Sequence, residues 1–245
     1  MFSFFRRQKQ VDQDYSFLGV DMHSHLIPGI DDGAKTMEDS VLLIRRLVDM
    51  GYRKIITTPH IMQEFFPNTP IVIRKGLEKV KAALQAEGIQ VELEAAAEYF
   101  VDESFEALLQ AEEEILHFSN KHVLIESSLL APSNNIFDAI FQLKTKGYQP
   151  ILAHPERYVY YADQWEVFER IHEMGCKMQV NLLSLAGHYG PAQKKLGVKL
   201  LKSGWIEFLG TDLHREGHLK KLNALWKDRT IRKLIQDQAF SNREL

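Results

Sequence analysis

The sequence predicts an α/β fold in which about seven parallel strands alternate with helices and close into a barrel. One phrase recurs along the chain: a helical pattern, a glycine, a few residues, and a short apolar run that ends in a histidine or an acid. Clear copies are residues 51–60, ending at His60, and residues 147–154, ending at His154. Glycine readily adopts the left-handed conformation that ends a helix, and a short apolar run between helices is typical of a strand buried on both faces.

Helices and strands are expected in regular alternation. Thr36, Ser133 and Asp163 each precede an apolar pattern of helical period, and side-chain oxygens at such positions cap the first turn of a helix. Repeated βα units without the glycine-rich turn of dinucleotide-binding proteins favour a closed barrel over an open, doubly wound sheet. The strands are expected near residues 20–23, 54–58, 90–96, 122–126, 150–153, 177–181 and 206–210.

The length of 245 residues fits one barrel domain, which we place at residues 19–245 after an N-terminal tail of residues 1–18. No linker or low-complexity segment divides the chain. The first ten residues carry aromatic and basic side chains, but they lack the apolar run and cleavage site of a secretory signal. We interpret them as a packed or frayed tail, with weak contact to a membrane surface as the alternative.

Composition and charge exclude several classes of protein. With 45% hydrophobic and 26% charged residues, the chain resembles ordinary globular proteins, and its net charge of −3 argues against nucleic-acid binding. No run approaches the roughly 18 apolar residues of a spanning helix, so no membrane insertion is expected. The single cysteine, Cys176, fits a reducing compartment, which favours the cytoplasm. Because Leu182 and not an arginine follows six residues later, a thiol-based phosphatase is excluded.

Residues of the types that bind metal ions end six of the seven expected strands. The active sites of α/β barrels lie at the carboxyl ends of the strands, so these side chains should meet at one rim. A lone histidine is usually structural, but eight such residues in matching positions favour a site. Two histidines that are two residues apart on a strand also point the same way. The eight residues are His23, His25, His60, Glu98, Glu126, His154, Asp212 and His214.

Imidazole and carboxylate ligands without thiolate suit manganese, iron, cobalt or zinc. Asp32, in an Asp-Asp-Gly loop, is either part of a capped turn or a ninth ligand. Arg157, three residues after His154, is either in a surface ion pair or in contact with phosphate, whose oxygens match the guanidinium fork. Arg215 and His218 could reach the mouth of the pocket. Four other histidines are interpreted as structural: His117, His122, His172 and His188.

These motifs, in this order, resemble the polymerase and histidinol phosphatase (PHP) superfamily. More narrowly, they resemble its bacterial capsule-associated, metal-dependent protein-tyrosine phosphatases. The resemblance covers the chain from about residue 19 onward and implies a distorted (β/α)7 TIM-like barrel. The motifs that carry it are Asp21-Met22-His23-Ser24-His25 with Asp31-Asp32-Gly33, Thr58-Pro59-His60, Ala97-Glu98-Tyr99, Leu124-Ile125-Glu126, the segment 153–158, and Thr211-Asp212-Leu213-His214.

The resemblance implies three divalent metal ions, usually described as manganese. The first would be bound by His23, His25, Glu98 and Asp212, the second by Glu98, Glu126 and His154, and the third by Asp32, His60 and His214. Arg157 matches the phosphate-binding arginine of the family. Some members carry another arginine several residues beyond the final histidine. This chain departs from that pattern, because Arg215 follows the histidine directly and residues 216–219 contain no arginine.

The expected reaction is hydrolysis of phosphotyrosine by attack of a metal-bridging hydroxide, with Arg157 stabilising the charge. Either a metal-bound water or the Asp212–His214 pair would protonate the leaving group. The resemblance implies a phosphotyrosine protein as substrate, the tail of a bacterial tyrosine kinase in polysaccharide export.

Two alternatives remain open. One is a small-molecule phosphatase such as a histidinol phosphatase, although the longest rim connection, 61–70, favours an open site. The other is a non-catalytic metal-binding module. An oligomer could form through the helix face of Met37, Glu38 and Arg45, but a solvated helix is the simpler interpretation.

Overall fold

The computed structural model describes residues 13–111, 113–133 and 135–245. Strands and helices alternate along the described chain, as expected. The strands are β1 (Val20–Asp21), β2 (Lys54–Thr57), β3 (His60–Ile61), β4 (Glu92–Ala95), β5 (Glu98–Phe100), β6 (His122–Glu126), β7 (Gln149–Ala153), β8 (Lys177–Asn181) and β9 (Phe208–Gly210). The α-helices are α1 (Met37–Asp49), α2 (Pro70–Ala86), α3 (Glu103–Gln110), α4 (Asn135–Thr145), α5 (Trp165–Glu173), α6 (Leu182–Leu185), α7 (Pro191–Ser203), α8 (Glu216–Lys227) and α9 (Arg229–Gln236), and three short 3-10 helices are η1 (Pro155–Arg157), η2 (Val159–Tyr161) and η3 (Ser241–Glu244).

All strand pairs are parallel, and they form two sheets in the orders β1-β2-β4 and β3-β5-β6-β7-β8-β9. The sheets are linked because β2 leads directly into β3, and β4 leads directly into β5. When each of these interrupted pairs is counted as one strand, seven strands follow each other in sequence order. The α/β fold class predicted from the sequence is confirmed. The prediction did not include the interruption of two of the strands.

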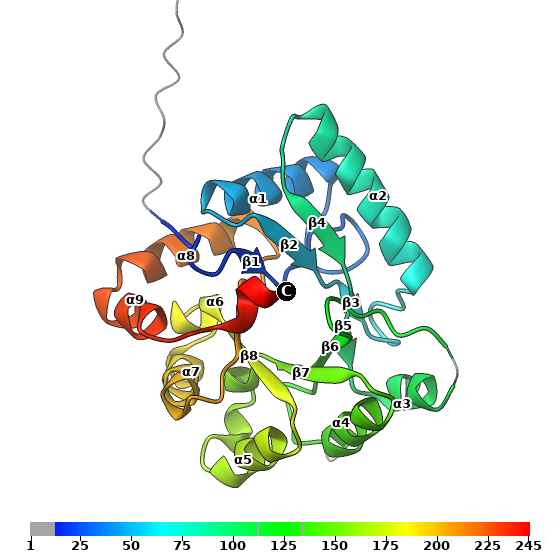
Figure 1. Ribbon diagram of the computed structural model, residues 1–245, viewed down its shortest axis with the longest axis vertical. Coiled ribbons are helices and arrows are strands. Elements are labelled where there is room, and N and C mark those ends of the chain that lie inside the picture. The colour runs from blue at the N-terminus through cyan, green and yellow to red at the C-terminus, as the bar shows by residue number, and fades with distance from the viewer. Residues whose placement is uncertain (1–12, 112, 134) are drawn as a thin grey trace, which may run out of the picture.

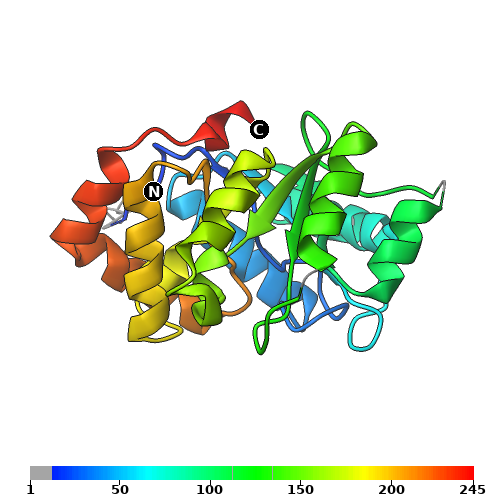
Figure 2. The same cartoon turned by 90° about the horizontal axis from the view of Figure 1, so that it is seen from below.

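The first and last strands meet through the residues that follow them. Ser24 and Leu213 form a parallel bridge, the Asp212 N–H donates to the His23 carbonyl at 2.8 Å, and the His25 N–H donates to the Leu213 carbonyl at 3.0 Å. The strands surround the centre of the molecule and the helices lie outside them (Figure 1). The connection after β3, in cyan, lies on the side opposite the C-terminus (Figure 2). This side holds the carboxyl ends of the strands.

The interior of the strand ring changes from apolar to polar along its axis. A compact cluster that includes Met22, Ile56, Leu124 and Phe208 is almost inaccessible to solvent. Alternate residues of a strand point to the same side, so Glu126 follows Leu124 on the inner face of β6. The larger apolar cluster contains residues of the outer helices, such as Leu47. The polar carboxyl end of the interior therefore lies above an apolar floor.

The helix starts agree with two of the three expectations. Thr36 caps α1 and forms a capping box with Asp39. The Ser133 hydroxyl accepts a hydrogen bond from the Asn135 N–H at 3.3 Å, at the start of α4. The expectation for Asp163 was wrong: α5 begins after Gln164, which makes no side-chain capping bond. Propensity places a cap only to within a residue or two, because several polar residues precede the helix.

The boundary between tail and domain at residue 18 stays a prediction, and the expected role of the first ten residues lies outside the described residues. Of the described part of this segment, Tyr15 and Leu18 are buried, and the Tyr15 hydroxyl donates to the Leu222 carbonyl at 3.0 Å. Residues 15–18 therefore pack against α8. Within the described chain, no helix has both the length and the apolar character needed to cross a membrane.

The buried Asn242 joins the outermost strands at the amino ends of the ring. Its amide donates to the carbonyls of Val20 and Leu209 at 3.0 and 2.8 Å and accepts from the Leu209 N–H at 3.0 Å. We expect Asn242→Ala to lower the free energy of unfolding by about 2–4 kcal/mol, because buried backbone groups lose their partners. Urea denaturation measures this. Ser241→Ala, whose hydroxyl bonds to no described residue, should change it by less than about 0.5 kcal/mol; equal losses would contradict the role of Asn242.

Candidate metal centre

The structure brings all nine expected ligand side chains together at the carboxyl ends of the strands. Six of them are buried, and Asp32 is the most exposed, with 58% of its side chain accessible. The strand order explains the convergence, because the carboxyl ends of parallel strands meet at one rim. The nine residues are His23, His25, Asp32, His60, Glu98, Glu126, His154, Asp212 and His214.

Four ligand atoms surround one point in the ring. The Nε2 atoms of His23 and His25 lie 3.2 and 3.4 Å from Glu98 Oε2. Both also lie 3.5 Å from Asp212 Oδ1, and the two Nε2 atoms are 3.4 Å apart. Ligands that are about 2.1 Å from a tetrahedral ion lie roughly 3.4 Å from each other. The spacing of this first group fits one divalent ion.

A second group uses the other oxygen of Glu98. His154 Nε2 lies 2.9 Å from Glu98 Oε1 and 3.6 Å from Glu126 Oε2. Glu98 thus presents one oxygen to each group, which is the arrangement of a carboxylate that bridges two ions.

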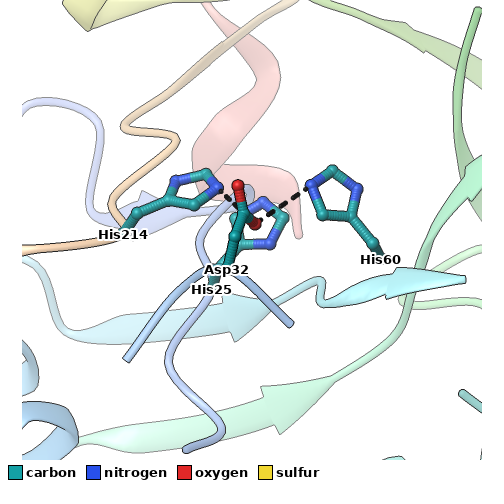
Figure 3. Close-up of side chains that lie close together, drawn as sticks. All are labelled: His25, Asp32, His60 and His214. Atoms are coloured by element: carbon teal, nitrogen blue, oxygen red, sulfur yellow. Dashed lines mark ion pairs between the residues drawn. The ribbon is translucent and has the colours of Figure 1, made fainter. Parts of the chain in front are cut away.

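A third group lies nearer the solvent (Figure 3). Asp32 Oδ1 lies 3.3 Å from His214 Nε2 and 3.5 Å from His60 Nε2, and His25 lies beside them. The Asp-Asp-Gly loop brings Asp32 here because Gly33 passes directly over His25. A Cβ atom on Gly33 would be 2.2 Å from the His25 carbonyl oxygen, so no larger residue fits without movement of the loop.

Several polar atoms of the site are buried without a hydrogen bond. His60 Nδ1 lies 2.9 Å from Glu126 Oε1 and 3.2 Å from Glu98 Oε2, yet none of the three atoms has a hydrogen-bond partner. A buried polar group without a partner costs about 1–3 kcal/mol, and more when it is charged. Lone pairs that converge in this way fit a bound cation, so the residues present match the metal ions that the sequence led us to expect.

Asp31, which the sequence analysis assigned only to a turn, orients His25. Its Oδ2 lies 2.8 Å from His25 Nδ1 and also accepts from the His60 N–H, while Oδ1 accepts from the Gly33 N–H. A carboxylate on one ring nitrogen leaves the other nitrogen free as a ligand. Asp31 and Asp32, adjacent in sequence, therefore have different functions.

A buried chain of amides on β8 connects two expected ligands. Asn181 donates through Nδ2 to Asp212 Oδ2 at 2.6 Å, and Gln179 donates through Nε2 to Asn181 Oδ1 at 2.8 Å. Gln179 Oε1 lies 2.8 Å from His23 Nδ1. Because an ionised carboxylate only accepts hydrogen bonds, the direction of the whole chain is fixed. His23 must carry its proton on Nδ1, which leaves Nε2 free to bind a metal ion. The sequence analysis missed both amides.

The backbone is strained at two of the nine residues. His154 and Asp212 have φ angles of 35° and 51°, in the left-handed region that residues with a Cβ atom rarely adopt. Such conformations cost on the order of 1–3 kcal/mol and cluster at functional sites.

Opposite charges control ionisation in the site. Burial alone would raise the pKa of Glu98, but His23 and His60 hold it well below its ordinary value. Burial would likewise lower the pKa of His60, but Glu126 and Glu98 outweigh it and raise this pKa to about 9. Burial would lower the pKa of His25 too, but Asp31, Asp212 and Glu98 together outweigh it and raise this pKa well above its ordinary value. Without metal, these histidines hold protons that a metal ion must displace.

The centre opens into a pocket of about 360 Å³. Arg157 lines it, with a guanidinium nitrogen 3.7 Å from Asp212 Oδ2 and the group stacked 4.3 Å from the centre of the Tyr189 ring. The Tyr189 hydroxyl donates to Asp212 Oδ2 at 2.8 Å. Arg157 is thus held beside the centre and not in a remote surface ion pair. Arg215 and His218 also line the pocket, as does His188, which the sequence analysis treated as structural.

A parallel α/β barrel with imidazoles and carboxylates at the carboxyl ends of its strands defines a class of barrel proteins with candidate metal-binding groups at one rim. Residues 19–238 match the family model described as capsular polysaccharide synthesis, CpsB/CapC. The chain belongs to this family.

Relatives and solved structures agree with this family assignment. The chain is 30% identical to the tyrosine-protein phosphatase CpsB of Streptococcus agalactiae, over 80% of this chain and 82% of that one. It is 29% identical to the tyrosine-protein phosphatase YwqE of Bacillus subtilis, over 80% and 77% of the two chains.

A solved structure from work on YwqE from B. subtilis and CpsB from Streptococcus pneumoniae, described as unique metal-dependent tyrosine phosphatases, matches with a TM-score of 0.76. It is 26% identical and covers 90% of this chain and 96% of that chain. A histidinol phosphate phosphatase from Lactococcus lactis, with a TM-score of 0.52 at 14% identity over 88% and 92% of the two chains, shares the fold.

The amide chain on β8 gives a first prediction for this site. In Asn181→Leu, Asp212 loses a donor and Gln179 loses its acceptor, so we expect manganese affinity to fall about 10–100-fold. Competition with a chromogenic chelator measures this, and circular dichroism checks the fold. Asn223→Leu, the same change on α8, should bind manganese like the wild type. Unchanged affinity in Asn181→Leu would contradict the role of the chain.

The raised histidine pKa values give a second prediction. Metal ions bind neutral imidazole, so protons compete with the metal below the pKa of about 9 of His60. Apparent manganese affinity should therefore rise from pH 6 to pH 9, with protons released on binding. Calorimetry in buffers of different ionisation enthalpy counts these protons. An affinity that is constant across this range would show that the histidines are already neutral.

Proposed function

We propose that this protein is a metal-dependent protein-tyrosine phosphatase. The observation that carries the proposal is the geometry of the centre: three ligand groups with unpaired buried atoms share one pocket with Arg157. The names of the relatives supply the substrate class. A role in capsule or exopolysaccharide synthesis is part of the proposal, supported by the family description. A cytoplasmic location is also part of it, supported by the single cysteine.

We propose three divalent ions, with manganese as the expected metal. The first would be held by His23, His25, Glu98 and Asp212, the second by Glu98, Glu126 and His154, and the third by Asp32, His60 and His214. When bound, divalent ions lower the pKa of water towards neutrality and neutralise phosphate charge.

The side chains at the pocket supply binding and orientation. Arg157 directs its fork at the phosphate oxygens, and stacking on Tyr189 together with the charge of Asp212 limits its rotation. Burial, followed by the charge of Asp212, raises the pKa of Tyr189 far above its ordinary value, so its hydroxyl stays a donor to Asp212. Arg157 and Tyr189 thus share one oxygen of Asp212, Oδ2, and leave Oδ1 to the first ligand group.

The tyrosine leaving group needs little help from a proton donor. Tyrosine leaves as a phenolate with a pKa near 10, well below that of an alkoxide. His214 Nδ1 lies 2.9 Å from the Asp212 carbonyl oxygen, so its proton is held there and Nε2 faces Asp32. The pKa of Asp212 lies well below its ordinary value, so this carboxylate is ionised and has no proton to give. We therefore propose water in the pocket as the proton source, and not the Asp212–His214 pair.

The proposed substrate is a phosphotyrosine in a protein, in particular the tail of a bacterial tyrosine kinase of polysaccharide export. A flexible tail can present a tyrosine side chain to a pocket that lies below the surface. The pocket is lined partly by apolar side chains, Met62, Phe66 and Leu129, which fit an aromatic ring above the phosphate.

Hydrolysis of a phosphotyrosine peptide tests the proposal. Phosphate release should require manganese, stop after chelation, and exceed release from histidinol phosphate. Arg157→Met should lower kcat/KM about 100-fold, because one preorganised charge at the transferred group is lost. Arg45→Met, the same change on the surface of α1, should have no effect.

His154→Ala should reduce both activity and the number of manganese ions bound per chain, as measured by elemental analysis. Preference for histidinol phosphate would move the assignment to a small-molecule phosphatase. Inactivity on both substrates with manganese bound would instead support a non-catalytic module.

A further inference from the structure

A second cavity lies beside the catalytic pocket, and nothing above uses it. We call it the side cleft. It has a volume of about 470 Å³ and opens between β5, α2 and α3. Its surface is mainly apolar, with Ile61, Ile71, Tyr99, Phe100, Phe105 and Leu108 among its lining residues.

The two cavities are separated by residues 60–68, the wall segment. Its side chains face the two cavities alternately: His60 and Met62 line the catalytic pocket, whereas Ile61 and Gln63 line the side cleft. This is the alternation of a single extended strand. At residues 60–63 the wall is therefore one strand thick, and beyond them Met62 and Phe66 pair across a turn.

The wall segment is held in place by its own hydrogen bonds. The Phe66 N–H donates to the Met62 carbonyl at 2.7 Å, and the Asn68 amide donates to the carbonyls of His60 and Ile30, both at 2.8 Å. Phe66 also stacks on His60. The wall is thus a built feature of the rim, and it fixes the position of the side cleft relative to the centre.

Apolar surface continues across the wall. Phe65 lies in the turn of the wall segment with 70% of its surface exposed, and Ile71 lies at the first turn of α2 with 63% exposed. Exposed large apolar side chains that gather on a surface typically mark a binding site. Ile71 lines the side cleft, and Phe65 belongs to the wall segment that separates the side cleft from the catalytic pocket.

The two cavities differ in their basic residues. Arg157 and Arg215 line the catalytic pocket beside carboxylates of the centre, whereas the side cleft is lined by Asp102, Glu113 and Glu114 and by no lysine or arginine among the described residues. Glu114 is paired with Arg74, but Asp102 and Glu113 form no ion pair with the residues that the structure describes. The side cleft therefore favours an uncharged side chain and disfavours an acidic or phosphorylated one.

Resting on the proposed phosphatase activity, we propose that the side cleft binds an aromatic or large aliphatic side chain of the polypeptide whose phosphotyrosine lies in the catalytic pocket. A strand with its side chains is about 10 Å thick, and an extended chain advances about 3.3 Å per residue, so roughly three residues pass across one strand. The bound side chain is thus about three residues from the phosphotyrosine. The protein selects substrates by this neighbour, and it discriminates against a second phosphotyrosine there.

A peptide series tests the subsite. One phenylalanine is moved through the four positions on each side of phosphotyrosine in an otherwise alanine- and serine-based peptide. We expect one position, about three residues away, to raise kcat/KM about tenfold through KM, the effect of burying one aromatic side chain. Aspartate or phosphotyrosine at that position should lower kcat/KM below that of the alanine peptide.

Two variants on the full-length, manganese-loaded protein locate the effect. Ser104→Trp places a bulky side chain in the side cleft, and Ile71→Ser removes apolar surface from its edge; neither residue belongs to the centre. Both should reduce the phenylalanine preference to about onefold and leave hydrolysis of p-nitrophenyl phosphate unchanged. Phe141→Ser is the matched control, because Phe141 is 65% exposed on α4 and lines neither cavity. It should retain the preference.

The outcomes separate the two proposals. Three results would overturn the side cleft as a subsite and leave the phosphatase activity intact. Phenylalanine could have no effect at any position, the preference could survive in both cleft variants, or Phe141→Ser could abolish it as well. If the manganese-loaded wild type does not hydrolyse p-nitrophenyl phosphate, the proposed function itself is overturned.

Discussion

The burial of several carboxylates at one end of the strand ring is the constraint on which the rest of the structure depends. Glu98 and Asp212 are almost inaccessible to solvent, and an isolated charge in such a place costs several kcal/mol. His23 and His25 lie within 3.5 Å of both, so opposite charges or hydrogen bonds compensate the loss of water. This compensation works only if six strand ends converge to within a few ångströms. The backbone bonds between the residues that follow β1 and those that follow β9 bring the first and last strand ends together.

The interruption of the two strands serves the same constraint. After β2 and β4 end, β3 and β5 pair so that His60 lies directly opposite Glu98. The inward direction of both side chains depends on this register, because a shift of one residue turns a side chain to the opposite face. Pro59 in the first interruption hints at the break, since it has no N–H to donate. The pairing itself joins segments almost forty residues apart, and no local pattern reveals it.

The difference between local patterns and contacts between distant segments also decides what the sequence could predict. Apolar runs that end in histidine or acid are local, and they identified the strands and the residues that now lie together. Gln179 and Asn181 were missed because polar residues in a strand have no local signature; only their contacts with His23 and Asp212 show their role. His188 lies in a connecting segment, where no local pattern indicates a function, and only the fold brings it to the pocket.

Three unfavourable features coincide in this centre and nowhere else among the described residues. His154 and Asp212 have strained backbone, His60, Glu98 and Glu126 have buried atoms without hydrogen bonds, and the carboxylates are desolvated. A site that served stability alone would gain from apolar replacements, since a buried ion cluster is often no more stabilising than packed hydrocarbon. Divalent cations at the proposed sites would instead pair the unpartnered atoms and neutralise the carboxylates in one event. The centre is therefore built for a ligand, and the surrounding fold supplies the stability that the centre itself lacks.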